Sequence, residues 1–246
     1  MKRVFLVFSL LLYSAALFGQ NLRVAVAANL QGVIKVLAND FKEKTGIEIE
    51  PIAGSSGNLA TQIKNGAPFD VFLSADISFP EGLFTEGFAT KAPEVYAYGS
   101  LVIVSTQDIG FENWERLLLT PGINKIAIAN PKIAPYGKAA EEALTKKGIW
   151  TDIQTKIVQG ESIAQVNTYI LTGVADVGFS TQSLIKDAEG KTKLYWKLID
   201  SQIYTPIKQG IVIMKATRQT ANAEKFYRYI LSADAKKILK AYGYGV

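Results

Sequence analysis

Apolar segments alternate with amphipathic segments along almost the whole chain, and this alternation constrains the fold more than any other feature. Residues 22–28 form a nearly continuous apolar run, typical of a strand that is covered on both faces. From residue 30 to Phe41, apolar residues recur every three to four positions, as in a helix with one buried face. The same order of strand and helix recurs after residue 47 and, later, after residues 125 and 156. This alternation predicts an α/β fold with mainly parallel sheets and helices on both faces.

The alternation also predicts two lobes. Residues 96–105 form a long strand-like run that is suited to carry the chain from one lobe to the other, and a second strand returns after Pro206. The helical pattern at 221–243 is expected to pack back on the first lobe. Two crossings of this kind imply a hinged ligand cleft between the lobes. The expected division is 20–98 and 206–246 for lobe I and 99–205 for lobe II, after a signal peptide at 1–19.

The first 19 residues have the composition of a secretory signal. Lys2 and Arg3 precede an apolar run that ends in small residues near Gly19. A membrane anchor is the alternative, but the run is short for a membrane span and no stop-transfer pattern follows it. The sequence contains no cysteine, so it has no site for lipid attachment. We therefore expect a periplasmic protein that is secreted and not lipid-anchored.

The chain contains neither histidine nor cysteine. This excludes Ser-His-Asp and Cys-His nucleophiles, thiol redox chemistry and the usual zinc and copper sites. The formal net charge of +5 is modest, and the basic residues form neither a stripe nor a nucleic-acid motif. We expect a binding protein without cofactor, metal cation or nucleic-acid partner. An enzyme on the same fold is the alternative from another class, although no catalytic pairing is visible in the sequence.

Four joints between a strand and the following helix carry small or uncharged polar residues. They lie at 28–29, 54–57, 134–137 and 160–162, two in each expected lobe. In open α/β sheets such joints lie at the carboxyl ends of strands, where ligands bind, and each offers unpaired N–H groups at a positive helix end. A single joint of this kind is an ordinary helix cap. Four of them, facing one another across a cleft, predict a site for a small oxyanion.

The chemistry of the donors limits which anions the site is expected to bind. A site made only of hydrogen-bond donors suits an anion that has no proton left to donate, whereas phosphate near neutral pH keeps at least one. No Asp or Glu lies in the first two joints, and we expect Glu161, in the fourth, to point to solvent. Sulfate, molybdate and tungstate are therefore favoured over phosphate. The choice among them depends on the radius of the pocket.

Four segments resemble the periplasmic molybdate-binding proteins of ABC importers. They are VAVAANL at 24–30, GSSGNLATQIKNGAPFDVFLSAD at 54–76, NPKIAPYG at 130–137 and ESIAQV at 161–166. The resemblance implies a two-lobe, type II periplasmic binding protein that closes on molybdate or tungstate. Such a protein delivers its ligand to an inner-membrane permease driven by an ATPase. We expect a monomer, and a sulfate- or phosphate-binding protein of the same fold is the alternative.

The resemblance also assigns ligand-binding residues. Asn29 and Ser56 match positions that supply side-chain and backbone donors from lobe I, with Ala28 or Ser55 as neighbours. Tyr136 and Ile163 match positions that contribute backbone N–H groups from lobe II, so their side chains would not take part.

The chain departs from the family pattern at two positions. Many members have serine where this chain has Asn29, and asparagine keeps both a donor and the capping role. A tyrosine that reaches the oxyanion in some members is replaced here by Ser180, which is therefore a further candidate contact. Molybdenum would be bound as its oxyanion and not as a metal cation.

Overall fold

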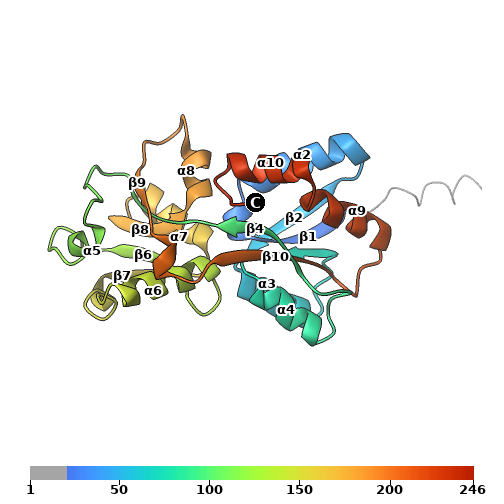
Figure 1. Cartoon of the computed structure of the whole chain (residues 1–246), viewed down its shortest axis with the longest axis horizontal. Helices are drawn as coiled ribbons and strands as arrows, with labels where there is room; N and C mark the ends of the chain where they lie inside the picture. The colour runs from blue at the N-terminus through green and yellow to red at the C-terminus, as the bar shows by residue number, and fades with distance from the viewer. Residues whose placement is uncertain (1–20) are drawn as a thin grey trace, which may run out of the picture.

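The computed structural model describes residues 21–246, which form two lobes lying side by side (Figure 1). Each lobe contains a five-stranded sheet flanked by helices, which confirms the predicted two-lobe α/β fold. The signal peptide predicted at 1–19 lies outside the described residues. Within the described part of the chain, no helix is long and apolar enough to cross a membrane.

The sheet of the first lobe is mainly parallel, as predicted. Its strands, in spatial order, are β2 (Ile49–Gly54), β1 (Leu22–Ala27), β3 (Val71–Leu73), β10 (Ile207–Ile213) and β4 (Glu94–Gly99). β1 is parallel to β2 and β3, whereas β10 is antiparallel to both of its neighbours. Four strands therefore point in one direction, and β10, which enters from the other lobe, points in the opposite direction.

Helices cover both faces of this first sheet. One face carries α2 (Val33–Thr45), α9 (Thr220–Ile230) and α10 (Ala233–Ala241), and the other carries α3 (Ser56–Lys64) and α4 (Ser78–Thr85). Successive residues of β1 point to opposite faces, so Val24 packs with Phe41 and Phe226, whereas Ala25 packs with Leu59. The predicted return of the C-terminal helices to the first lobe is confirmed.

The second lobe repeats this plan. Its strands, in spatial order, are β7 (Ile157–Gly160), β6 (Ile126–Ala129), β8 (Val177–Thr181), β5 (Leu101–Ser105) and β9 (Tyr195–Leu198). β5 alone among these strands points against the others. The helices of this lobe are α5 (Trp114–Leu117), α6 (Pro135–Lys146), α7 (Ile163–Leu171) and α8 (Gln182–Ala188). Short 3₁₀ turns complete the structure at η2 (Ala28–Leu30), η3 (Gln154–Lys156) and η4 (Ser201–Ile203).

The connections between the lobes lie at the centre of Figure 1, where β4 and β10 reach toward the second lobe. The run 96–105, predicted as one long strand, is divided at Ser100 into β4 and β5, which belong to different sheets. The C-terminus returns to the same region, where Gly245 and Tyr98 exchange two backbone hydrogen bonds of 2.7 and 2.9 Å. Segments that are distant in sequence therefore lie together where the two lobes are connected.

Candidate functional site

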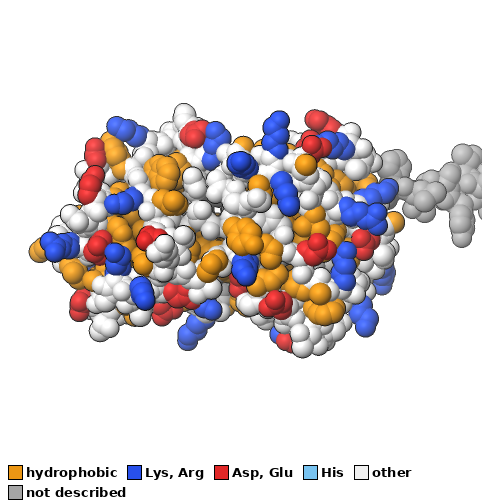
Figure 2. Space-filling model, in the orientation of Figure 1, with side chains coloured by type: hydrophobic (Ala, Val, Ile, Leu, Met, Phe, Trp, Pro, Cys, Tyr) orange, Lys and Arg blue, Asp and Glu red, His pale blue; other side chains and the backbone are white. Residues whose placement is uncertain are grey.

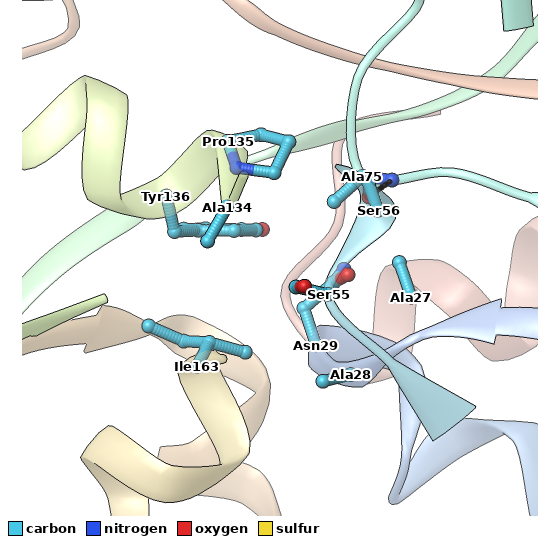
Figure 3. Close-up of a pocket in the computed structure, with 10 residues that line it drawn as sticks. All are labelled: Ala27, Ala28, Asn29, Ser55, Ser56, Ala75, Ala134, Pro135, Tyr136 and Ile163. Atoms are coloured by element: carbon cyan, nitrogen blue, oxygen red, sulfur yellow. Dashed lines mark hydrogen bonds between the residues drawn. The ribbon is translucent and has the colours of Figure 1, made fainter. Parts of the chain in front are cut away.

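Residues of the first three predicted joints, and Ile163 directly after the fourth, line a single small cavity between the lobes (Figure 3). Its volume is about 10 Å³, which is close to the minimum that holds one water-sized group. Pockets for drug-sized organic ligands are roughly 300–1,000 Å³, so this cavity suits a small ion instead. The lining residues are Ala27, Ala28, Asn29, Ser55, Ser56, Ala75, Ala134, Pro135, Tyr136 and Ile163.

The structure brings six of the seven candidate residues to this lining: Ala28, Asn29, Ser55, Ser56, Tyr136 and Ile163. The seventh, Ser180, is fully buried in β8 outside the lining, and its hydroxyl donates a hydrogen bond to the side chain of Asn167. Sequence reasoning did not single out the side chains of Ala27, Ala75 and Pro135. They carry no polar group, and their contribution is to keep the cavity small.

Two serine hydroxyls face the cavity where β2 passes into α3. Ser55 occupies the N-cap position, yet its side chain makes no capping hydrogen bond and its Oγ is buried without a partner. Ser56 Oγ accepts a hydrogen bond of 3.0 Å from the backbone N–H of Ala75. Because a hydroxyl carries one hydrogen, both serines keep that hydrogen for an acceptor in the cavity. A buried hydroxyl without a partner costs free energy unless a ligand completes it.

Asn29 lies in η2, is 4% exposed and is held from several sides. Its Nδ2 donates to Gln209 Oε1 at 2.9 Å and to Tyr244 Oη at 3.2 Å, and its Oδ1 has no partner. Its backbone oxygen accepts from Tyr244 Oη at 2.8 Å and from Ser183 Oγ at 2.9 Å. Ser183 belongs to α8 of the second lobe, so Asn29 also joins the two lobes.

Two helix N-termini enter the cavity from the second lobe. The first N–H groups of a helix have no acceptor within that helix, and they lie at its positive end. α6 begins with Pro135, which has no N–H, so Tyr136 offers the first free amide of that helix. α7 begins at Ile163, whose amide follows the capping residue Ser162. Helix ends arranged in this way bind anions without any charged side chain.

The electrostatics of the lining depend on dipoles. The lining contains no Asp, Glu, Lys or Arg, and burial raises the pKa of the Tyr136 phenol well above its usual value. The phenol is therefore neutral at physiological pH. Glu161 is exposed, as predicted. Among residues 21–246, no group of three or more acidic side chains gathers in a way that could hold a metal cation.

The lobes contact one another directly around the cavity. The backbone N–H of Gly57, in α3, donates to the carbonyl oxygen of Ile133 in the second lobe at 2.9 Å. Ala27, Ala28 and Ala75 of the first lobe pack against the hydrophobic core of the second lobe. The cavity is therefore walled on both sides and has little room for solvent.

Comparison with known proteins agrees with this arrangement. Residues 22–245 match the family of bacterial extracellular solute-binding proteins. The molybdate-binding protein ModA of Azotobacter vinelandii is 35% identical over 96% of this chain and 94% of its own length. The protein of the same name from Rhodobacter capsulatus is 38% identical over 89% of this chain and 86% of its own.

The solved structure of the periplasmic molybdate-binding protein of A. vinelandii superimposes on this one with a TM-score of 0.87 and 38% identity. The match covers 92% of this chain and 99% of that chain. The relatives are solute-binding proteins and not enzymes, in agreement with the prediction from composition. The chain therefore belongs to the bacterial extracellular solute-binding proteins, and its predicted resemblance to the periplasmic molybdate-binding proteins of ABC importers is confirmed.

Proposed function

We propose that this protein captures molybdate or tungstate between its lobes and delivers it to an ABC transporter permease in the inner membrane. The proposal rests on the convergence of three uncharged joints, and of the helix start at Ile163, on one small cavity whose lining has no charged side chain. The relatives named above as molybdate-binding proteins support this ligand over others.

Hydrogen-bond chemistry supports a fully deprotonated tetrahedral anion. The cavity offers hydroxyl and amide donors from Ser55, Ser56, Tyr136 and Ile163 but no carboxylate that could accept a proton from the ligand. Hydrogen phosphate would have to donate its proton to a neutral oxygen such as Asn29 Oδ1 or a serine Oγ, which is a weaker acceptor than a carboxylate. Sulfate has the same charge and shape as molybdate with shorter bonds, so it is the alternative ligand of the same fold.

Capture would proceed by closure of the lobes. The anion first meets the hydroxyls and amides of the first lobe, at Asn29, Ser55 and Ser56. The second lobe then adds the amides of Tyr136 and Ile163 and excludes water, and this strengthens every dipole that faces the anion. In this proposal, residues 20–98 and 206–246 move as one rigid lobe and residues 99–205 as the other.

The cellular setting follows from the same reasoning. The signal at 1–19 would direct export, and the absence of cysteine leaves the mature protein free of a lipid anchor. We propose that it acts as a periplasmic monomer and meets only the anion and the permease. On the face that Figure 2 shows, basic and acidic side chains are interspersed over both lobes, and such a face does not favour nucleic acid.

Calorimetric titration of the mature protein with molybdate, tungstate, sulfate and phosphate tests the proposal. One-to-one binding of the first two anions, with weak or absent heat from the others, is expected. Binding of sulfate or phosphate alone would agree with an anion site in the cleft but contradict the proposal that the ligand is molybdate or tungstate. Absence of heat from all four anions would contradict the oxyanion site itself.

A further inference from the structure

A buried glutamine lies behind the cavity and belongs to none of the four joints. Gln209 is in β10, is 0% exposed and does not line the cavity. The pairing between β10 and β4 shifts register between Gln209 and Gly210, an irregularity of the kind that redirects a side chain. A fully buried amide must find several hydrogen-bond partners, and the identity of those partners indicates what Gln209 does.

Gln209 contacts residues from both sides of the site. Its Oε1 accepts from Asn29 Nδ2 at 2.9 Å and from Tyr96 Oη at 2.9 Å. Its Nε2 lies 3.5 Å from Tyr136 Oη of the second lobe, at the outer limit of a hydrogen bond. A Cβ atom at Gly99 would lie 2.2 Å from Tyr136 Oη and 3.1 Å from Gln209 Nε2, so the glycine leaves room for this cluster.

With both amides oriented as described above, the hydrogens in this cluster do not balance. Tyr96 Oη lies 3.0 Å from the backbone oxygen of Ser74 and 2.9 Å from Gln209 Oε1, but it has a single hydrogen for these two acceptors. Asn29 Oδ1, in contrast, has no donor. Burial raises the pKa of both Tyr96 and Tyr136, so each phenol keeps its hydrogen and cannot remove the mismatch by ionising.

A half-turn of both amides removes the mismatch at Tyr96 and at Asn29 Oδ1, because amide nitrogen and oxygen occupy nearly equivalent positions. Tyr244 Oη would then face Asn29 Oδ1 and could donate to it, since the backbone oxygen of Asn29 also accepts from Ser183 Oγ. The two hydrogens of Gln209 Nε2 would then be donated to Asn29 Oδ1 and Tyr96 Oη. Tyr96 would donate its hydrogen to Ser74 alone, and Tyr136 could donate to Gln209 Oε1. Asn29 Nδ2 would be released toward the cavity, where it needs an acceptor.

We propose that Gln209 is a positioning residue that couples anion binding to the orientation of the Asn29 amide. With an oxyanion in the cavity, Gln209 donates to Asn29 Oδ1 and thereby holds Asn29 Nδ2 toward the anion. This inference rests on the proposed oxyanion function. It adds that Gln209, which does not contact the ligand, affects the affinity for the oxyanion.

A double-mutant cycle tests whether Gln209 acts through Asn29. Gln209→Met keeps the length of the side chain and removes both hydrogen-bonding groups. Asn29→Ser replaces the amide by a hydroxyl that rotates freely and needs no orientation by Gln209. Molybdate affinity is measured by calorimetry in the mature wild-type protein, both single variants and the double variant.

We expect Gln209→Met alone to weaken molybdate binding by about tenfold, the size of one lost hydrogen bond to a charged group. The same change in the Asn29→Ser background should have less than about a twofold effect, because there is no amide left to orient. Unchanged affinity in Gln209→Met, or an equal loss in both backgrounds, would overturn the inference while the proposed function stands. Absence of molybdate binding by the wild-type protein would overturn both.

A spectroscopic measurement on the wild-type protein covers the case in which Gln209→Met fails to fold. The side-chain amide resonances of Gln209 are assigned in a wild-type ¹⁵N-labelled sample from their contacts with Tyr96. Molybdate should shift them strongly, because the Asn29 side chain, which contacts the Gln209 amide, then donates to the anion. Resonances that stay in place while molybdate saturates the protein would overturn the coupling.

Discussion

If the lobes close on the anion as proposed, the contact between Gly57 and Ile133 makes that closure sensitive to a single methyl group. A Cβ atom at Gly57 would lie 2.9 Å from both Cα and Cβ of Ile133, and such a contact forces the second lobe away. Overpacking of this kind costs typically 1–3 kcal/mol. With the lobes apart this contact would be lost, and alanine inside a helix is more favourable than glycine by roughly 0.5–1 kcal/mol. The added Cβ would, however, still lie 3.0 Å from Cζ of Phe79 in α4 of the same lobe. Gly57→Ala should therefore change the stability of the ligand-free protein little while it weakens binding.

The expected loss of molybdate affinity for Gly57→Ala is roughly 5- to 150-fold, measured by calorimetry. Gly82→Ala is the matched control, since Gly82 also lies in a helix of the first lobe and nothing is found within 4 Å of the position of its Cβ. The control should raise the melting temperature and leave affinity unchanged. Wild-type affinity in Gly57→Ala would show that the two lobes do not approach each other at this contact when the anion binds.

Two further predictions concern the donors and the pH dependence. Ser56→Ala removes a donor to a desolvated anion and should weaken molybdate binding roughly 10- to 150-fold. The control Ser232→Ala removes the N-cap of α10 and should lower stability without changing affinity. Equal affinities in the wild-type protein and Ser56→Ala would show that Ser56 is not part of the site. Burial raises the pKa of Tyr96, Tyr136 and Tyr244, so the neutral phenols stabilise the fold below the unfolded tyrosine pKa of about 10. The free energy of unfolding, measured in urea, should stay constant up to about pH 10 and decrease at higher pH. Molybdate affinity should stay constant from about pH 6 to 9. A marked change of affinity within that pH range would show that a titrating group contacts the ligand.

Much of the fold was predictable because its signals are local. The apolar run at 22–28 and the helical stripe that follows it correspond to β1 and α2. β9 was missed, because most of its side chains are exposed and it therefore lacks an apolar pattern. The division of 96–105 into two strands was also missed, since both halves are apolar and the choice of sheet depends on distant partners.

The candidate site was predictable where its chemistry lies at helix starts. The fold brings four residues from such positions to one cavity: Asn29, Ser56, Tyr136 and Ile163. Gln209 was not predictable, because it lies in the middle of a strand and its burial depends on the place of β10 between β3 and β4.

The sequence could not show whether Ser180 contacts the ligand. Alignment with the family pattern places a ligand contact at this position, but the structure shows a hydroxyl that is paired with Asn167 outside the cavity lining. Pattern matching can locate a position along a strand, whereas the partner of its side chain depends on the packing of neighbouring helices.

The position of the bound ion would show whether the anion lies between the lobes. Crystals of the mature protein grown with molybdate would be measured at the molybdenum absorption edge. The account predicts one anomalous peak between the lobes, with anion oxygens about 2.7–3.1 Å from Ser56 Oγ, Asn29 Nδ2 and the amide nitrogens of Tyr136 and Ile163. A peak elsewhere on the protein, or an anion in the cleft that touches only one lobe, would contradict it.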